Sequence, residues 1–292
     1  MRMDTYDLMM KRRSTRRFED RSVPPELTDR LLDAAVSAPS GGNIQPLSIV
    51  VVEEPRARAD LAEIVGGQPW VANAPLSLVF CVDFHRVKRW AAMFEVEFLG
   101  EHTLGTFLIA YADLMCAAQN VVVLAEASGL GSVYIGTIQA GIGKARERFG
   151  MPTHVLPMMV LSLGYPRSIP KSIPKLSREA MVHREHYRVP SDDEIRDAYE
   201  SKYGSIEDDV DAYLSRAYVE VIEADAQSDT EWAESARRRM KKLEIRSNAG
   251  FLFNLRYPQR MMMRMNSRLL AELAKAGFEF DGLEAGGGRL SE

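Results

Sequence analysis

The segment from Thr106 to Ser128 limits the possible folds of this chain more than any other feature. Its residues, TFLIAYADLMCAAQNVVVLAEAS, are apolar nearly all round a helical wheel, and Gly129 follows where a helix would end. A helix with so little polar surface must be covered from several sides, in a core or at a subunit interface. The sequence therefore predicts a long, central helix.

Shorter segments alternate around this helix. Apolar, β-branched segments predict buried strands at LSIVVVEE (47–54), PLSLVFCVDF (75–84), SVYIG (132–136) and HVLPMMVLSLGYP (154–166). Apolar residues at helical spacing predict helices within 4–14, 23–39, 55–67 and 143–152. Helices that alternate with short apolar strands indicate an α+β or α/β sandwich.

The character of the chain changes after this part. Prolines between Pro166 and Pro174 predict an extended segment, and the sequence from Ser191 onward is helical in pattern and strongly charged. Ser191 and Glu194 have the spacing of a capping box. We expect a core domain over 1–190 and a helical extension over 191–292, which packs on the core or on a partner subunit and ends in a frayed tail.

Composition excludes several classes of protein. The chain has 292 residues, 46% hydrophobic and 27% charged, with a formal net charge of −4, which suits a folded globular protein rather than a nucleic-acid binder. No unbroken aliphatic run is long enough to cross a membrane, and no secretory pattern is present, so a cytoplasmic protein is expected. Cys81 and Cys116 form no disulfide framework or metal-ligand spacing, and their apolar neighbours predict buried thiols.

One stretch breaks the mildly acidic pattern. KRRSTRRFED carries five cations in the seven positions from Lys11 to Arg17, interrupted by Ser14 and Thr15. Guanidinium groups beside hydroxyl donors are suited to holding a phosphate. A solvated basic turn explains the same residues, and the stretch by itself leaves both interpretations open.

Several motifs occur together in a fixed order: the basic cluster, SGGNIQP, GGQ, AAQN with AEASGLG, YIG and VHREHY. This set resembles the FMN-dependent nitroreductase family, in particular its oxygen-insensitive NAD(P)H nitroreductase and flavin oxidoreductase branch. The resemblance extends from residue 1 to about 190, and more loosely over about 230–282. It implies an α+β sandwich with a central, mainly antiparallel sheet flanked by helices, and a helical C-terminal excursion.

The resemblance gives the basic cluster a function. In the family, this segment grips the phosphate and ribityl chain of FMN, which implies that role for Arg12, Arg13, Ser14 and Arg16. Ser40 corresponds to another FMN contact.

The motifs SGGNIQP and GGQ contain side-chain amide groups that the resemblance places at the flavin. Asn43 and Gln45 offer these groups to the pyrimidine edge of the flavin, although an Asn/Gly/Pro turn before a strand explains the same residues. Gln68 of the GGQ motif is a further family contact.

The segment Tyr134, Ile135, Gly136 and Thr137 corresponds to the family segment along the isoalloxazine ring. Gly136 is the position whose backbone N–H would point at flavin N5, because a residue without Cβ lets the backbone approach a flat ring. The branch often has two glycines here. Thr137 departs from that pattern and either adds a hydroxyl near N5 or narrows the pocket.

The resemblance implies that the segment KSIPKLSRE (171–179) also contacts the FMN phosphate. Lys175 matches a family cation, whereas the other family cation aligns with Ile173, so Lys171 would have to replace it. His183, His186 and Tyr187 of VHREHY resemble a structural signature of the family rather than catalytic groups.

The resemblance implies chemistry carried by the cofactor, with no catalytic side chain and no metal. Hydride would pass from NADPH or NADH through flavin N5 to a small acceptor (a nitroaromatic, a quinone or a flavin) by a ping-pong mechanism in a homodimer. Other possibilities stay open: reductive dehalogenation or ring fragmentation, a flavin reductase that supplies reduced FMN, or a non-catalytic flavin-binding regulatory protein.

The C-terminal region departs from the branch around 243–265, which looks like an insertion. Arg237, Arg238 or Arg239 could bind the 2′-phosphate of NADPH, although such a run is more often a solvated helix face. Four methionines could line a substrate entrance or pack against a partner subunit: Met261, Met262, Met263 and Met265.

Overall fold

The computed structural model describes residues 4–168, 170, 174–204 and 238–281. The chain divides into two compact units, one made of residues 1–169 and 265–292 and the other of residues 170–264. The expected core domain over 1–190 and helical extension over 191–292 stay a prediction.

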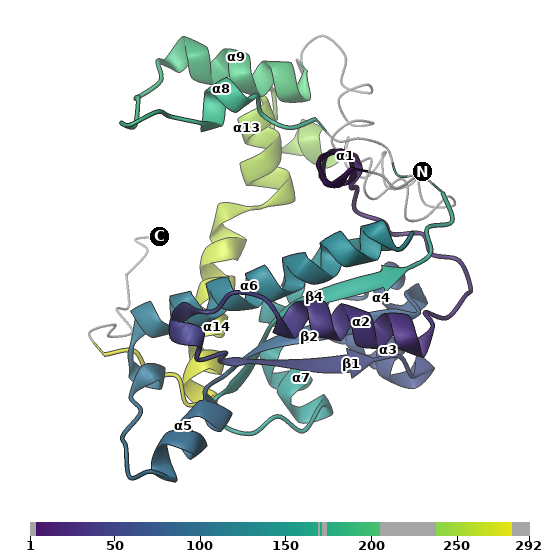
Figure 1. Cartoon of the computed structure of the whole chain (residues 1–292). Helices are drawn as coiled ribbons and strands as arrows, with labels where there is room; N and C mark the ends of the chain where they lie inside the picture. The colour runs from purple at the N-terminus through teal and green to yellow at the C-terminus, as the bar shows by residue number, and fades with distance from the viewer. Residues whose placement is uncertain (1–3, 169, 171–173, 205–237, 282–292) are drawn as a thin grey trace. The chain divides into compact units, whose positions relative to one another are not determined.

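A four-stranded sheet forms the centre of the first unit (Figure 1). Its strands are β1 (Leu47–Val52), β2 (Leu76–Asp83), β3 (Gly131–Ile135) and β4 (Val155–Gly164), in the order β1-β2-β4-β3. Every neighbouring pair is antiparallel. The predicted antiparallel sheet is therefore confirmed.

The strands of this sheet differ in how far they are buried. β2 and β4 lie in the middle and are buried at every residue. β1 lies at an edge, and only Val52 of its six residues is fully buried. The prediction of a buried strand there was wrong. Edge position alone does not explain this, because β3 lies at the other edge and is buried at four of its five residues; an apolar run does not reveal how completely the rest of the chain covers a strand.

Helices cover both faces of this sheet (Figure 1). One face packs against α2 (Pro25–Val36) and α6 (Leu104–Ala127), and the other against α3 (Pro55–Ile64), α4 (Pro69–Asn73) and α7 (Ile142–Arg148). The remaining elements of this part are α1 (Thr5–Lys11), α5 (Phe84–Ala92) and the 3-10 helices η1 (Gly41–Asn43), η2 (Gly100–His102) and η3 (Gly136–Ala140).

Helix α6 is the central helix that its composition predicted. It packs on α2 and on the sheet through residues such as Leu114 and Val121, which are 0% exposed. With 24 residues and an 18-residue window of mean hydropathy 1.7, α6 is also long and apolar enough to span a membrane, and 44% of that window is buried within the structure. Core helices of soluble proteins meet the same criterion, so this feature is weak evidence for a membrane span.

The two cysteines differ in their surroundings. Cys81 on β2 is buried, and desolvation raises the pKa of its thiol to about 12. Cys116 on α6 is exposed, so the prediction of a buried thiol was wrong at this position. The reason is that the side of α6 that carries Cys116 is apolar but faces away from the core.

The C-terminal end of α14 (Gln259–Lys275) and the residues after it belong to the first unit. The ring of Phe278 lies 5.5 Å from that of Phe84 and 5.6 Å from that of Phe107, and only 2% of the residue is exposed. The His154 amide donates to the carbonyl of Ala276 at 2.8 Å. These contacts explain why the chain's last described residues group with the core.

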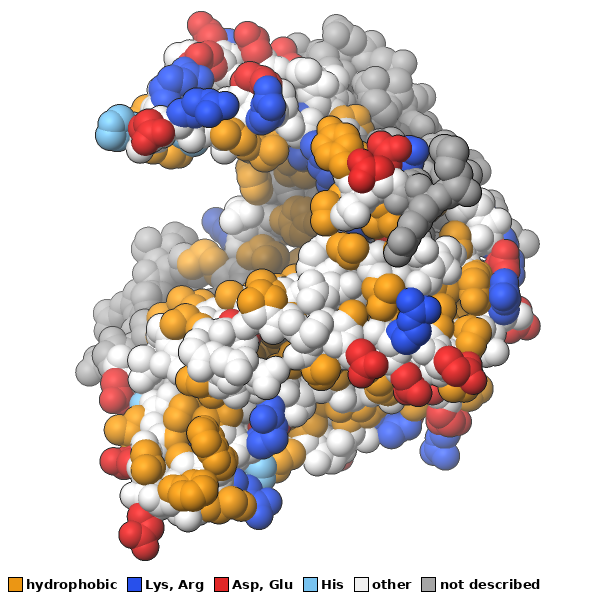
Figure 2. Space-filling view, in the orientation of Figure 1, with side chains coloured by type: hydrophobic (Ala, Val, Ile, Leu, Met, Phe, Trp, Pro, Cys, Tyr) orange, Lys and Arg blue, Asp and Glu red, His pale blue; other side chains and the backbone are white. Residues whose placement is uncertain are grey.

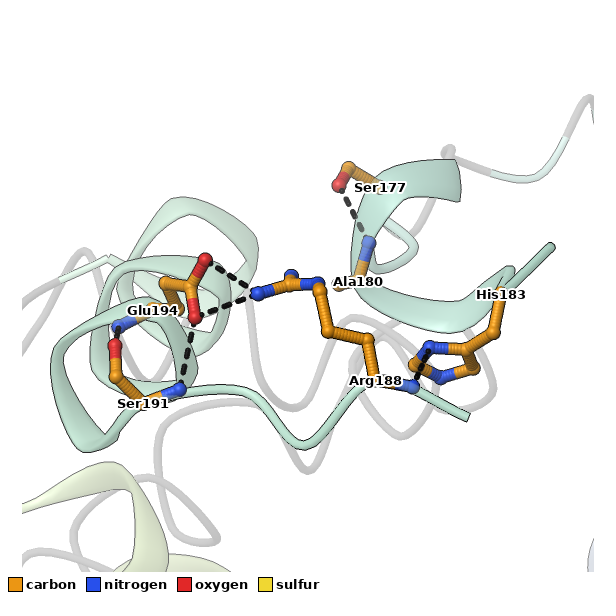
Figure 3. Close-up of polar contacts among 6 residues, drawn as sticks. All are labelled: Ser177, Ala180, His183, Arg188, Ser191 and Glu194. Atoms are coloured by element: carbon orange, nitrogen blue, oxygen red, sulfur yellow. Dashed lines mark hydrogen bonds and ion pairs between the residues drawn. The ribbon is translucent and has the colours of Figure 1, made fainter. Parts of the chain in front are cut away.

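The second unit contains α8 (Arg178–Met181), α9 (Asp192–Tyr203), α13 (Asn248–Gly250) and the π-helix η4 (Phe251–Arg256). The predicted capping box is present: Ser191 Oγ accepts from the Glu194 amide, and the Glu194 carboxylate accepts from the Ser191 amide (Figure 3). Arg188 also donates to this carboxylate at 2.8 and 2.9 Å. The predicted tail after residue 281 lies outside the described residues.

Candidate functional site

The basic cluster is fixed to the edge strand β3. Ser14 forms an isolated parallel bridge with Ser132, and the Thr15 amide donates to the Ser132 carbonyl at 2.9 Å. Thr15 is only 3% exposed and packs on Gly131, where a Cβ would lie 2.6 Å from the Thr15 Cβ. The chain therefore leaves α1 and joins the sheet at a defined register.

The three predicted guanidinium groups lie around this bridge and are half-buried. Arg13 donates from Nη1 to the carbonyls of Met10 and Arg12, both at 2.8 Å, and so covers the end of α1. The Arg16 guanidinium lies 5.6 Å from the ring centroid of Trp70 on α4. These contacts hold Arg13 and Arg16 in place, unlike side chains of a solvated basic turn.

The second predicted segment continues along the same strand. Since β3 runs from Gly131 to Ile135 and η3 begins at Gly136, Gly136 lies four positions after Ser132. An extended strand covers about 13 Å over that distance. One strand therefore connects the basic cluster and the predicted flavin-ring segment at a spacing that a mononucleotide can bridge.

Gly136 has open space where a side chain would project. A Cβ at this position would meet no described atom within 4 Å, and its φ is not in the left-handed region. At Gly141, by contrast, a Cβ would lie 2.5 Å from the Ile64 carbonyl oxygen. Neither packing nor backbone conformation within the described chain requires glycine at 136, which fits a position approached by a ligand.

Thr137 and Gln68 form a pair beside Gly136. Thr137 Oγ1 donates to the Val65 carbonyl at 2.8 Å and accepts from Gln68 Nε2 at 2.7 Å. Gln68 Nε2 also donates to the Val65 carbonyl at 3.1 Å. Both amide hydrogens of Gln68 are engaged, and the carbonyl oxygen is the group left for a ligand. Thr137 thus orients Gln68.

The side chains of Tyr134 and Ile135 point into the protein. The Tyr134 hydroxyl donates to Gln119 Oε1 on α6 at 3.1 Å, and desolvation raises the pKa of Tyr134 to about 12. Ile135 is 3% exposed within the core. Contacts from these two residues to a ligand would have to use the backbone. We call Arg12–Arg16, Gln68 and Tyr134–Thr137 the β3 group.

The remaining predicted residues form a separate loop group, Ser40–Gln45. Ser40 Oγ donates to Asp113 Oδ2 on α6 at 2.8 Å and accepts from the Gln45 amide at 2.9 Å. The Gly41 amide donates to Asp113 Oδ1 at 3.0 Å. The Gln45 side chain donates to the Val36 carbonyl at 3.0 Å, whereas Asn43 is exposed with a φ of 54°.

The two groups contact different sides of α6. Asp113 holds the loop group, whereas Gln119 contacts Tyr134 of the β3 group, and Glu126 lies in the field of Arg12 and Arg13. At about 100° per residue, Gln119 and Glu126 lie about 120–140° around the helix from Asp113. Within one copy of the chain, α6 separates the two groups.

Sequence reasoning missed Asp113, Gln119, Glu126 and Trp70. A signal was present for two of them, because Asp113 and Glu126 are the only charged residues in the 24 of α6. A carboxylate in an apolar helix requires a partner, and both carboxylates lie at the predicted site. No comparable signal marked Gln119 or Trp70.

The predicted lysines are not placed at the site. Lys175 is exposed in the second unit, and Lys171 lies outside the described residues, so both stay predictions. The ring of His183 lies 4.3 Å from that of Tyr187, and His183 Nδ1 accepts from the Arg188 amide at 3.3 Å (Figure 3). These local contacts agree with a structural role for this motif.

Further predicted residues belong to the C-terminal region. Arg238 and Arg239 are exposed, and Arg237 lies outside the described residues. Met261, Met262 and Met263 are 40–49% exposed. No group of three or more His, Cys, Asp or Glu residues is placed to hold a metal ion in the part of the chain that the structure describes.

Comparison with known proteins decides the family. The model described as "Nitroreductase family" matches residues 9–165, more than half of the chain and including both groups of the site. This chain belongs to the nitroreductase family. The family implied by the ordered motifs is therefore confirmed.

Individual relatives of this nitroreductase-family chain have related names. It is 33% identical to "FMN reductase (NADPH)" of Bacillus subtilis over 65% of this chain and 77% of the relative. It is 31% identical to "Oxygen-insensitive NADPH nitroreductase" of Salmonella typhimurium over 87% of this chain and 97% of the relative.

Solved structures share its fold. B. megaterium NfrA2 superposes with a TM-score of 0.73 at 27% identity, covering 96% of this chain and 100% of that one. "NADPH:FMN oxidoreductase from Vibrio harveyi complexed with NAD+" superposes with a TM-score of 0.63 at 29% identity, covering 74% and 89%. The nitroreductase-like sandwich predicted from the motifs is thereby confirmed.

Proposed function

We propose that this protein is an FMN-dependent oxidoreductase that oxidises NADPH or NADH and reduces a small nitroaromatic, quinone or flavin. The observation that carries the proposal is the open space at Gly136, on the strand that also anchors the basic cluster. The relatives named FMN reductase and NADPH nitroreductase support the same cofactor and reductant.

The residues of the β3 group fit FMN. Arg12, Arg16 and the Ser14 hydroxyl would hold the phosphate, since guanidinium groups and hydroxyls together suit that anion. The backbone at Gly136 would lie against the ring, and the Gln68 carbonyl oxygen would accept from a ring N–H. When bound, FMN supplies the hydride chemistry, and the chain's residues hold and orient it.

We also propose that the active form is a homodimer with the flavin at the subunit interface. The exposed side of α6 is apolar, and Leu108 and Ile109 on it are 54% and 56% exposed. Figure 2 also shows exposed apolar side chains over α5 and the segment after it, where Trp90 and Phe94 are 60% and 70% exposed. Burial of such surface favours association.

The two site groups give a second reason for a dimer. The apolar side of α6 lies between the side that holds Asp113 and the side that holds Gln119 and Glu126. A second copy packed there through a two-fold axis would bring its loop group toward the β3 group of the first copy. Sedimentation of the flavin-saturated protein tests this, and a monomer with full flavin occupancy would contradict it.

The decisive experiment is spectroscopic. We expect the purified protein to be yellow, to bleach anaerobically with NADPH or NADH, and to recover its colour when a nitroarene or quinone is added. Parallel-line steady-state kinetics would support a ping-pong mechanism through one shared site. A colourless protein that FMN cannot reconstitute would contradict the proposal.

The names of the relatives favour two acceptors, a free flavin and a nitro compound. Steady-state rates with FMN and with a nitroarene, measured at the same NADPH concentration, distinguish them. A flavin reductase would have the higher kcat/KM with FMN, and a nitroreductase with the nitroarene.

A further inference from the structure

Gln68 lies where two helices meet, and its side chain caps neither of them. Val65 is the last cap residue of α3, and Gly66 and Gly67 follow with φ of 97° and 76°, a left-handed turn that suits glycine. Gln68 is then the N-cap residue of α4. An N-cap side chain usually accepts from an amide of its own helix, but in the described structure Gln68 makes no such bond.

The side-chain amide of Gln68 instead turns back to the end of α3 and to η3. Its Nε2 atom donates to the Val65 carbonyl at 3.1 Å and to Thr137 Oγ1 at 2.7 Å. Thr137 Oγ1 donates to the same Val65 carbonyl at 2.8 Å. The three groups therefore form a closed triangle of hydrogen bonds, in which each group contacts the other two.

The protons of this triangle have one satisfactory arrangement. A backbone carbonyl only accepts, so the Thr137 hydroxyl donates its one proton to Val65 and can only accept from Gln68. The end of the Gln68 amide that faces these two acceptors must then be the NH2 group. The reversed amide would place two oxygens without a proton at hydrogen-bond distance. The Gln68 carbonyl oxygen is thereby directed away from both partners.

We propose that Thr137 is a positioning residue, which fixes Gln68 as a hydrogen-bond acceptor toward the flavin, and that the site thereby selects a ring with an N–H at N3. This inference rests on the proposed function, which places the ring beside Gly136, next to Thr137 in η3. Oxidised flavin has one ring N–H, at N3, and the other polar atoms of that edge are acceptors. An amide held in one orientation matches only the N–H.

The physical reason for an effect on binding is preorganisation. Because the triangle already holds the Gln68 amide, no rotation of that amide has to be stopped when the ring binds. Without the Thr137 hydroxyl, the Val65 carbonyl is the one described acceptor left for the Gln68 NH2 group. The amide then turns more easily, and the contact to the flavin N–H becomes weaker and less selective.

Fluorescence titration of the apoprotein with FMN and with N3-methyl-FMN tests this inference. Wild type should bind FMN about tenfold more tightly, because the methyl group removes the donor and leaves the Gln68 oxygen unpaired. Thr137→Val keeps the shape of the side chain without its hydroxyl. It should bind FMN about three- to tenfold more weakly than wild type and distinguish the two flavins less.

Thr137→Ser is the matched control, because serine keeps the hydroxyl and lacks the methyl group. It should resemble wild type in both measurements. A role in packing alone would give the reverse order, since valine fills the volume of threonine and serine does not.

A double-mutant cycle shows whether Thr137 acts through Gln68. Gln68→Ala should weaken FMN binding and reduce the preference for FMN over N3-methyl-FMN. In the Gln68→Ala background, Thr137→Val should change FMN binding by less than about twofold, because the group that it positions is gone.

The outcomes separate the inference from the proposed function. Four results overturn the inference and leave the proposed function standing: equal binding of both flavins by wild type, wild-type behaviour of Thr137→Val, failure of Thr137→Ser to restore binding, and additive effects in the cycle. Wild-type protein that binds neither flavin overturns the proposed function. Thermal unfolding shows whether each variant is folded, and Thr137→Ala removes the same hydroxyl if Thr137→Val does not fold.

Discussion

The β3 group and the loop group differ in how they are held. The β3 group is part of the sheet, anchored by the Ser14–Ser132 bridge, by the buried Thr15 and by the Thr137–Gln68 pair. The loop group has no strand partner, and the Asp113 carboxylate alone accepts from both Ser40 and Gly41.

The two groups therefore represent two ways of positioning binding residues: by the backbone of a sheet, and by side-chain contacts to a loop. A group that belongs to a sheet is positioned by many cooperative contacts, so the loss of one side chain leaves the backbone in place. A loop held by a few side chains, here chiefly Asp113 with Gln45 and Arg86, depends more strongly on each of them. The β3 group therefore suits the part of the site that must be rigid, and the loop group the part that varies.

The largest effect is expected at Asp113. Asp113→Ala removes the carboxylate that accepts from Ser40 and Gly41 and should lower the free energy of unfolding by about 2–4 kcal/mol. A single hydrogen bond to a charged group contributes about 1.5–3 kcal/mol, and these two are half-buried and share one carboxylate, so their sum is less than additive. Urea denaturation measures this. Asp113→Asn keeps one acceptor oxygen and should lose less. Equal stability of the alanine variant and wild type would show that the loop does not depend on this carboxylate.

The next effect concerns the register of the basic cluster. Arg16→Ala should weaken FMN binding by about 1.5–3 kcal/mol, because it removes a charge-assisted contact to the proposed phosphate. Arg17→Ala, the matched control one position on, should change little. Fluorescence titration of the apoprotein measures both, and a reversed order would mean that the register is shifted by one residue.

Gly131 at the start of β3 and Gly136 of the β3 group allow a sharper test. Gly131→Ala places a Cβ 2.6 Å from that of Thr15 and should lower the free energy of unfolding by about 1–3 kcal/mol through overpacking. Gly136→Ala projects into open space, so it should leave thermal stability nearly unchanged and yet weaken FMN binding. If Gly136→Ala bound FMN as tightly as wild type, the flavin would not lie against this position.

The smallest effect is a change in pH dependence. Because burial raises the pKa of Glu126 to about 7 in the folded apoprotein, folding favours the protonated acid. The contribution of the protonated Glu126 carboxyl to the free energy of unfolding is fully present below the unfolded pKa of about 4.3, and it is lost as pH rises through 7. Differential scanning calorimetry should therefore show that Tm, from pH 5 to pH 8, falls more for wild type than for Glu126→Gln. Parallel profiles would contradict this.

Local patterns in the sequence determined much of the fold. The apolar composition of 106–128 predicted α6, short apolar, β-branched segments predicted all four strands, and Ser191 with Glu194 predicted the start of α9. The end of α1 at the basic cluster was also predictable. These features depend on residues close in sequence, and periodicity and capping act over that range.

Only the tertiary structure decided the partners across the site. Thr137 orients Gln68 from 69 residues away, and Asp113 holds Ser40 from 73 residues away. The exposure of Cys116 likewise depends on which side of α6 meets the sheet. Strand order and helix packing bring such residues together, and no local pattern encodes these contacts, because each arises from the sheet's register and from the sides that the helices bury.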